Sequence, residues 1–171
     1  MRYRYCPLCR SELHTERTDD GHPFRQKCPK CRYVHYNNPK SCVGALIIRD
    51  GKLLMIQRAH EPYKHHWDFP GGFLISGELP KTGLKREVAE ELGIRIKIIR
   101  RLGEYTDTYG PHGVPTLNMY FLCRRLGGRL RLETAEIADA RWFHLEEFPP
   151  QLAFTHTARL IRDFKELQIL V

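Results

Sequence analysis

Residues Gly72–Ile94 read GFLISGELPKTGLKREVAEELGI, a glycine-containing loop followed by a segment with helical composition. The helix should begin near Pro80, because the first helical turn does not need the N–H group that proline lacks. It should end at Gly93, because glycine readily adopts the left-handed conformation that closes many helices. The stretch therefore predicts a loop followed by a helix over residues 80–92.

Acidic side chains gather on one side of this expected helix. At about 100° per residue, Glu87, Glu90 and Glu91 span an arc of roughly 100°. The apolar stripe beside them consists of Leu84, Val88 and Leu92. Like charges in this arrangement repel one another unless a cation lies among them, and clustered carboxylates suit Mg²⁺ or Mn²⁺. A solvated acidic face beside a core stripe is the alternative.

The loop before the helix contains Pro70-Gly71-Gly72 and Ser76-Gly77-Glu78, which allow tight turns and close backbone approach to phosphate groups. Loop and helix together resemble the Nudix box at every fixed position of that motif. The match consists of Gly72, five residues, Glu78, seven residues, Arg86-Glu87, apolar Val88, one residue, Glu90-Glu91, one residue, Gly93 and apolar Ile94. The resemblance implies an α/β/α sandwich with a mixed sheet, and a hydrolase that cleaves diphosphate bonds.

The resemblance also implies roles for the residues of the box. Glu87, Glu90 and Glu91 are expected to bind Mg²⁺ or Mn²⁺ and to act in catalysis, with the Gly72 carbonyl group as a further metal ligand. A divalent cation offsets the charge of a diphosphate and activates water. Arg86 is expected to orient the acidic side chains and to take part in catalysis. A plain i,i+4 ion pair between Arg86 and Glu90 is the simpler alternative.

Other residues are candidates for the remaining roles. The expected substrate-binding residues are Arg58, Gly71, Gly72 and Glu78. Outside the box, Glu136 is the candidate for a catalytic base or a further metal ligand, with Glu133 as a second acid in the same segment. An ordinary polar loop is the alternative for both. Three tyrosines are candidates for stacking on a base or a flavin, with burial in the core as the alternative. They are Tyr105, Tyr109 and Tyr120.

Two C-x2-C pairs near the N-terminus, Cys6-Pro7-Leu8-Cys9 and Cys28-Pro29-Lys30-Cys31, are separated by eighteen residues. This spacing predicts a zinc ribbon with Zn²⁺ held by Cys6, Cys9, Cys28 and Cys31, and the role of the ion should be structural because four thiolates leave no open position. A pair of disulfides is the alternative. Residues 1–5 lack the apolar core of a signal peptide, so a cytoplasmic location is expected.

Length and charge limit the classes of partner. The chain has 171 residues and a net charge of +8, which favours polyanionic ligands, either nucleotides or RNA. A soluble basic surface without a specific partner is the alternative. No apolar run approaches the roughly 20 residues of a membrane helix, so no membrane partner is expected. Cys42 and Cys123 lie in apolar runs and are predicted to be buried core thiols.

The chain divides into an expected zinc ribbon, residues 1–37, and an expected Nudix domain, residues 38–171. Asp50-Gly51 predicts a tight hairpin turn between strands over 43–48 and 52–58. Short strands are predicted at 67–72 and 140–144. Longer ones are predicted over 95–103, 116–124 and 129–132. A closing helix is expected over about 152–168, since Leu160, Ile161, Phe164 and Leu167 recur at helical spacing.

A ribbon in front of a Nudix domain resembles NADH pyrophosphatases and the ribbon-bearing hydrolases of ADP-ribose or FAD. The Ser-Gln-Pro-Trp-Pro-Phe-Pro segment of the NADH enzymes is missing from the stretch LGEYTDTYG at residues 102–110. The expected activity is therefore hydrolysis of a nucleoside diphosphate linked to another group, such as ADP-ribose or FAD. An RNA-binding or RNA-cap-processing module is the alternative, and a homodimer is in keeping with the family.

Overall fold

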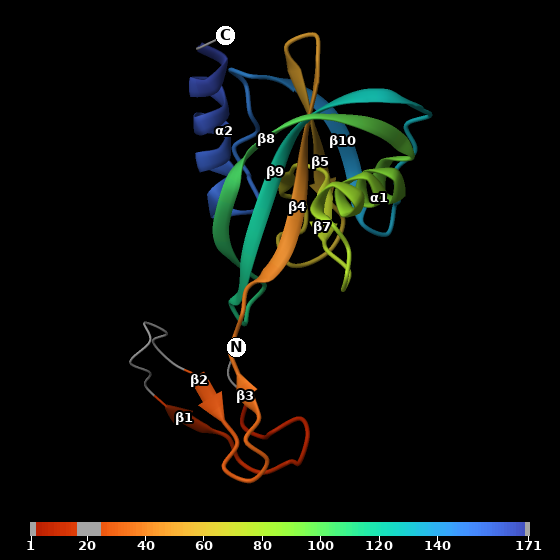
Figure 1. The fold of residues 1–171 in the computed structure, drawn as a ribbon. Helices are drawn as coiled ribbons and strands as arrows, with labels where there is room; N and C mark the ends of the chain where they lie inside the picture. The colour runs from red at the N-terminus through yellow and green to blue at the C-terminus, as the bar shows by residue number, and fades with distance from the viewer. Residues whose placement is uncertain (1–2, 17–24, 170–171) are drawn as a thin grey trace.

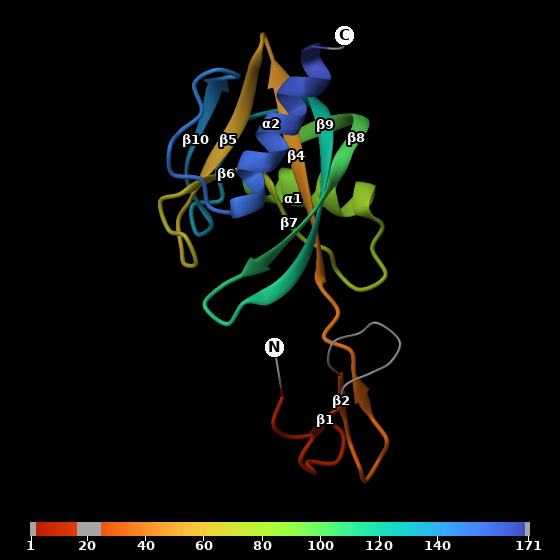
Figure 2. The ribbon, with the colours of Figure 1, turned by 90° about the vertical axis from the view of Figure 1, so that its left-hand side faces the viewer.

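The computed structural model describes residues 3–16 and 25–169, with side chains up to residue 166, so the Leu167 side chain lies outside the described part. The chain forms two parts (Figure 1). The smaller part is a three-stranded antiparallel sheet of β1 (His14–Glu16), β2 (Arg25–Lys27) and β3 (Val34–His35). It lies beyond the end of the larger part, and the chain between β3 and β4 joins the two (Figures 1 and 2).

The larger part contains a seven-stranded mixed sheet. Its strand order is β10-β5-β4-β9-β8, while β6 pairs with β5 and β7 pairs with β4. The pairing of β4 with β9 is parallel and the other pairings are antiparallel. The strands are β4 (Lys40–Arg49), β5 (Lys52–Arg58), β6 (Trp67–Asp68), β7 (Gly71–Phe73), β8 (Ile94–Tyr109), β9 (Val114–Gly128) and β10 (Ile137–His144).

Two helices cover opposite faces of this sheet, α1 (Pro80–Leu92) on one and α2 (Thr155–Ile169) on the other (Figures 1 and 2). The apolar stripe of α1 is fully buried in a core cluster with residues of β4, β8 and β9. Leu160, Ile161 and Phe164 of α2 join a second cluster on the other face. The predicted α/β/α sandwich with a mixed sheet is therefore confirmed. Within the described residues, no helix is long and apolar enough to cross a membrane.

The β4–β5 hairpin follows the prediction from Asp50-Gly51. Asp50 has a φ of 51° and Gly51 a φ of 71°. Two positive φ angles in a two-residue loop match the twist of the flanking strands, and Asp-Gly is a favoured pair for this turn. The predicted helix also has the expected ends, because Pro80 occupies its first turn and Gly93 closes it with a φ of 65°.

Four predicted elements differ clearly from the structure. The strands expected over 95–103 and 116–124 are longer, since β8 and β9 pair from Ile94 to Tyr109 across three irregularities. No strand forms over 129–132, because backbone N–H groups in and just after this segment donate hydrogen bonds to the last carbonyl groups of α1. Arg131 N donates to Leu92 O at 2.9 Å, and Glu133 N donates to Glu91 O at 2.9 Å. The closing helix begins at Thr155, three residues later than expected.

Candidate active site and a cysteine cluster

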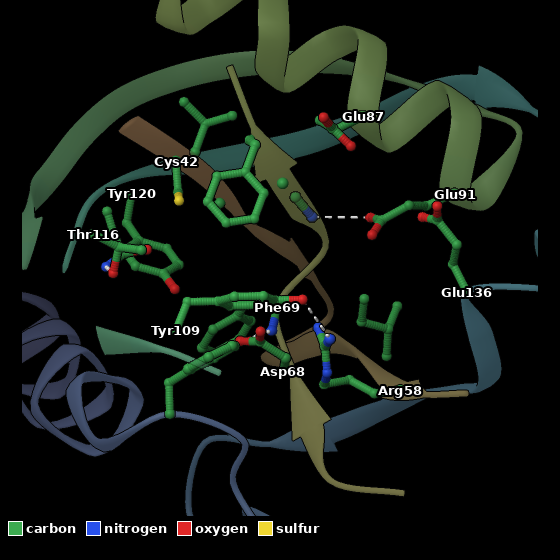
Figure 3. A pocket seen from close by; sticks show the side chains of 18 of the residues that line it. Cys42, Arg58, Asp68, Phe69, Glu87, Glu91, Tyr109, Thr116, Tyr120 and Glu136 are labelled. Atoms are coloured by element: carbon green, nitrogen blue, oxygen red, sulfur yellow. Dashed lines mark hydrogen bonds between the residues drawn. The ribbon is translucent and has the colours of Figure 1, made fainter. Parts of the chain in front are cut away.

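A cavity of about 280 Å³ lies where α1, β7, β10 and the start of α2 approach one another. Figure 3 shows two unlike sides of this cavity. Acidic side chains occupy one side, namely Glu87, Glu91 and Glu136. The other side carries Cys42, Thr116 and Tyr120, with Asp68 and Phe69 between the two. Sequence-predicted residues therefore meet here with several that the sequence did not single out.

The acidic half is built by the box helix against the glycine loop. Glu91 is only 6% exposed, and its Oε2 atom accepts a hydrogen bond from Gly71 N at 2.9 Å. The half-buried Glu87 lies directly against Gly72, where an added Cβ would come within 2.6 Å of Glu87 Oε2. A side chain at position 72 would occupy the space beside that carboxylate. The glycine thus keeps its own backbone open to whatever the carboxylate binds.

Gly71 is required for a different reason. Its φ is 147°, and a Cβ there would lie 2.0 Å from the carbonyl oxygen of Val43 on the neighbouring strand. Only glycine allows β7 to approach β4 this closely. The close pairing holds the Gly71 N–H group in place to bind Glu91.

Arg86 organises the outer edge of the acidic half. Its guanidinium donates twice to the Glu78 carboxylate, from Nε at 2.9 Å and from Nη2 at 2.7 Å. Its Nη1 atom also donates to Glu87 at 2.8 Å and to Glu90 at 2.9 Å. The i,i+4 pair with Glu90 and the wider orienting contacts therefore coexist. Glu78 is held in the loop in turn, because its Oε2 atom accepts a hydrogen bond from Ile75 N at 3.2 Å.

The three box glutamates do not all face the cavity. Glu87 and Glu91 line it, whereas the Glu90 side chain is 58% exposed, pairs with Arg86 and does not contribute to the lining. Glu136 lines the cavity from the loop before β10, on the same side as Glu91 (Figure 3), and its carbonyl oxygen accepts a hydrogen bond from Ala59 N at 2.8 Å, which anchors its loop to the end of β5. Glu133 does not line the cavity.

The electrostatics of the acidic half favour a cation. Burial, together with the charges of Glu87, Asp68 and Glu136, raises the pKa of Glu91 well above its usual value. Burial also raises the pKa of Glu87, although Arg86 opposes this shift. Within the described chain, Glu91 has no ion-pair partner. Clustered carboxylates, of which Glu87 pairs with Arg86 and Glu91 pairs with no cation of the described chain, lie beside an open Gly72 backbone and have the donor chemistry that fits Mg²⁺ or Mn²⁺.

Asp68 is the carboxylate that sequence reasoning missed. It is buried at the cavity, its Oδ1 atom accepts a hydrogen bond from Phe69 N at 2.8 Å, and burial raises its pKa to about 7. A strand of two residues gives no alternation pattern from which its inward direction follows. Arg58 also lines the cavity, but its Nε atom donates to Pro62 O at 2.8 Å and its guanidinium lies over aromatic rings.

The aromatic half combines predicted and missed residues. Tyr109 and Tyr120 line the cavity, whereas Tyr105 does not and donates to Asp163 of α2 at 2.8 Å. Sequence analysis did not single out Phe154, which also lines the cavity, nor Asp107 and His156. Asp107 is hydrogen-bonded to His156 Nδ1 at 2.8 Å, and His156 Nε2 is hydrogen-bonded to the Tyr120 hydroxyl at 2.8 Å. Cys42 lines the cavity and is half-buried, so its prediction as a core thiol is wrong, whereas Cys123 is fully buried.

The four N-terminal cysteines form a cluster of their own. Their Sγ atoms all lie within 4.8 Å of one another, with Cys6 and Cys31 3.5 Å apart and Cys9 and Cys28 3.4 Å apart. A disulfide needs about 2.05 Å between sulfurs, so these thiols are not bonded to one another. The cluster is consistent with a small zinc-binding ribbon, because zinc–sulfur bonds of about 2.3 Å place tetrahedral sulfurs roughly 3.8 Å apart.

A comparison with known protein families agrees with the features of the cavity and the box helix. The protein-family model described as NUDIX domain matches residues 38–164, which is most of the chain. The chain belongs to the Nudix family. The matched range contains the glycine loop, the box helix and the mixed sheet.

Relatives and solved structures agree with this membership. An NAD-capped RNA hydrolase NudC from Vibrio parahaemolyticus is 31% identical over 149 residues, which cover 86% of this chain and 53% of the relative. The chain thus spans about half the length of that relative. An ADP-ribose pyrophosphatase from Methanocaldococcus jannaschii is 31% identical over 133 residues, 78% of this chain and 77% of the relative.

A solved Nudix structure covers almost all of the chain. The crystal structure of a NUDIX hydrolase from Nitrosomonas europaea is 29% identical and has a TM-score of 0.76. The alignment covers 95% of this chain and 89% of that one. The likeness therefore extends beyond the box helix to nearly the whole fold.

Proposed function

We propose that this Nudix protein hydrolyses the pyrophosphate bond of a nucleoside diphosphate linked to another group, such as ADP-ribose or FAD, and releases a mononucleotide. The reaction depends on Mg²⁺ or Mn²⁺. The observation that carries the proposal is the meeting of Glu87, Glu91 and Glu136 around one cavity beside the open Gly72 backbone. The ADP-ribose pyrophosphatase among the relatives supports the substrate class.

The residues of the chain divide the work between binding and activation. Glu87 and Glu91, with the Gly72 carbonyl group, would hold the cation, and Glu90 would join them from the exposed end of the same helix turn. A bound divalent cation supplies charge neutralisation for the diphosphate and activation of water. Arg86 keeps the Glu87 carboxylate in place through its 2.8 Å contact and fixes the loop through Glu78.

Glu136 is the proposed general base. It lines the cavity from the loop before β10, beside Glu91 (Figure 3), is exposed, and has no ion-pair partner in the described residues. An exposed carboxylate beside the expected cation ligands is suited to accept a proton from the attacking water. Glu136→Gln should therefore lower kcat more than it changes KM.

Zinc in the four-cysteine cluster is proposed as a structural ion. Among the described residues of the ribbon, the buried apolar ones are Cys6, Leu13 and Cys28, which is a very small core. A module of that kind needs a metal to fold, because metal binding then supplies its folding free energy. We place the boundary between the ribbon and the Nudix domain at residues 37 and 38.

A substrate panel tests the proposal. The purified protein is incubated with ADP-ribose, FAD, NADH, sugar nucleotides and oxidised nucleotides, with and without millimolar Mg²⁺, and products are separated by chromatography. We expect mononucleotide release from at least one dinucleotide-type substrate only when Mg²⁺ is added. No product from any compound, or release of inorganic phosphate alone, would remove the pyrophosphatase assignment.

Hydrolysis of a nucleotide cap on RNA is the second candidate. It is favoured by the similarity to the NAD-capped RNA hydrolase NudC and by the net charge of +8. Lack of the NADH-type segment at residues 102–110 argues against a close match in specificity. A short RNA with a 5′ NAD group, compared with free NAD at the same concentration, separates the two candidates. Cap removal much faster than hydrolysis of the free dinucleotide supports the RNA function.

A further inference from the structure

The cavity has a second half that the proposed hydrolysis does not use. Tyr109 at the end of β8, Phe154 immediately before α2, and Arg58 at the end of β5 meet there from three distant parts of the chain. Phe73 approaches Tyr109 edge-on, with ring centroids 5.2 Å apart. These four residues are called the aromatic wall below.

Two rings of the aromatic wall are aligned with each other. The rings of Tyr109 and Phe154 lie within 26° of parallel, with centroids 6.0 Å apart. The Arg58 Cζ atom lies 5.9 Å from the Tyr109 centroid and 5.7 Å from the Phe154 centroid. Further contacts hold Phe154, because Tyr63 packs against its edge at 5.1 Å and His156 lies nearly parallel to it at 5.7 Å. The wall is thus a preformed surface of flat faces.

Core packing does not explain this wall. Aromatic residues in a folded domain usually serve the core, as Phe69 and Tyr120 do here. Tyr109, Phe154 and Phe73 belong to neither core cluster of the Nudix domain and are not among the residues packed against those clusters. They remain partly exposed at the cavity. Flat apolar faces left open beside a phosphate-type site are suited to a flat ligand.

Fixed hydrogen-bond acceptors line the cavity beside the wall. Both donors of the buried Asn118 amide are occupied, since Nδ2 binds Tyr105 O at 3.1 Å and Thr116 Oγ1 at 3.0 Å. The carbonyl contact fixes the amide orientation, so Oδ1 is left as an acceptor. Asp68 adds a buried carboxylate whose hydrogen bond within the described chain comes from the adjacent Phe69 N–H. Asn118 Oδ1 and the Asp68 carboxylate can both accept hydrogen bonds, so they favour a ligand that carries N–H or O–H donors.

The size of the cavity limits what it encloses. Its volume of about 280 Å³ lies just below the roughly 300–1,000 Å³ range of ligand pockets. It therefore holds about one nucleotide, not both halves of a dinucleotide. With the phosphate-binding groups on the side of Glu87 and Glu91, the base or ring of that nucleotide falls away from them, toward Tyr109 and Arg58 of the aromatic wall (Figure 3).

Building on the proposed hydrolysis, we propose that the aromatic wall binds the planar heteroaromatic ring of one nucleotide half of the substrate. The ring stacks on Tyr109 and Phe154 with Arg58 against them, and its N–H donors face Asp68 and Asn118. The preferred substrates are then diphosphates that end in a nucleobase or flavin ring with a free N–H edge. Diphosphates of sugars without such a ring at the bound end are disfavoured.

Binding measured without divalent cations tests this site separately from hydrolysis. Affinities for AMP, GMP, FMN and ribose 5-phosphate are compared by calorimetry in the wild type, Tyr109→Ala and Phe154→Ala. Tyr36→Ala is the matched control, because Tyr36 is 54% exposed and lies outside the cavity. At least one ring-bearing nucleotide should bind about 10-fold or more tightly than ribose 5-phosphate. That advantage should disappear in both cavity variants and persist in Tyr36→Ala.

Three results would overturn the site. They are equal binding of ribose 5-phosphate and the ring-bearing nucleotides, no measurable binding of any ring-bearing nucleotide, and an unchanged ring advantage in both cavity variants. None of them depends on turnover, so hydrolysis can persist while the ring site fails, and the reverse also holds. Thermal unfolding of each variant shows whether a loss reflects misfolding.

The acceptor edge has its own test. The tightest ring-bearing nucleotide is compared with a counterpart in which methyl groups replace every hydrogen on its ring or amino nitrogen. The wild type should bind the methylated compound about 5-fold or more weakly, since a buried acceptor then loses its donor. Asp68→Asn should narrow this difference. Equal affinity of the two compounds for the wild type would contradict the assigned edge.

Discussion

Arg86 and Glu78 form a two-pronged ion pair across the box, with guanidinium-to-carboxylate distances of 2.9 and 2.7 Å. Arg86 lies on α1 and Glu78 lies in the preceding loop, so the pair ties the loop to the helix. The carboxylate of Glu78 and the guanidinium of Arg86 are both mostly buried, at 12% and 24% exposure. The same guanidinium holds Glu87, so loop position and carboxylate position are coupled.

Arg86→Lys should lower hydrolysis by about 10- to 100-fold while the fold persists. A lysine ammonium is a point charge and does not reproduce the paired contacts to Glu78 together with those to Glu87 and Glu90. Steady-state kinetics with saturating Mg²⁺ measure the loss. Arg124→Lys is the control, because Arg124 is exposed and lies away from the cavity. Wild-type activity in Arg86→Lys would show that the charge alone suffices.

Gly71→Ala should be far more destabilising than Gly110→Ala. Both glycines have positive φ angles, 147° and 71°, so both substitutions introduce backbone strain of about 1–2 kcal/mol. An added Cβ meets nothing within 4 Å at Gly110 but lies 2.0 Å from Val43 O at Gly71. Chemical denaturation gives the two changes in unfolding free energy. Similar values for the two variants would mean that β7 shifts freely away from β4.

Several parts of the fold follow from local sequence alone. Pro80 and Gly93 mark the helix ends because their backbone preferences act locally, and Asp50-Gly51 sets its turn for the same reason. The acidic half of the site was equally predictable, since Glu87 and Glu91 follow from helix periodicity once the helix is placed. Glu90 shares that periodicity but pairs with Arg86 at the exposed end of the arc, which periodicity does not distinguish.

The aromatic half depends on contacts between distant segments. Asp107 accepts hydrogen bonds from Thr155 Oγ1 at 2.9 Å and His156 N at 3.0 Å, and so fixes the start of α2 from a strand 48 residues earlier. These hydrogen bonds bring Phe154 and His156 to the cavity. No local sequence pattern in residues 152–156 predicts them. Likewise, residues 129–132 alternate arginine and leucine as a strand does, but the Arg131 N–H group binds Leu92 O at the end of α1.

Asp68 predicts a pH dependence of stability in buffer without divalent cations. Its carboxyl pKa is about 7 in the folded chain against an ordinary value of 3.8, so the folded state holds the proton more tightly. The resulting stabilisation is complete below about pH 4 and is lost as the pH rises through 7. Asp68→Asn removes this titration. The unfolding free energy of the wild type relative to Asp68→Asn should therefore fall by on the order of 2–3 kcal/mol between pH 5 and pH 8.

The comparison with Asp68→Asn also removes an opposing effect. Burial lowers the pKa of His156, so its contribution is lost as the pH falls below about 6.5, the opposite direction. Because His156 is the same in both proteins, the difference between them isolates Asp68. Parallel pH profiles for the two proteins would show that Asp68 is ionised throughout.

Zinc content tests the ribbon. One Zn²⁺ per chain should be found by elemental analysis in the wild type, and Cys28→Ala should lose it because Cys28 is a buried member of the sulfur cluster. Cys42→Ala is the control, since Cys42 lies outside that cluster. The ribbon of Cys28→Ala should be cleaved by protease far faster than that of the wild type. Full zinc content in Cys28→Ala would rule out the four-thiolate site.

The decisive measurement is the dependence of hydrolysis on Mg²⁺ in Glu91→Gln, with Glu147→Gln as an exposed control acid outside the cavity. The wild type and Glu147→Gln should release mononucleotide in proportion to bound Mg²⁺. In Glu91→Gln, the rate should fall by about 100-fold or more at every Mg²⁺ concentration while thermal unfolding stays cooperative. Hydrolysis without any divalent cation, or a near-normal rate in Glu91→Gln, would contradict the proposed metal-dependent mechanism.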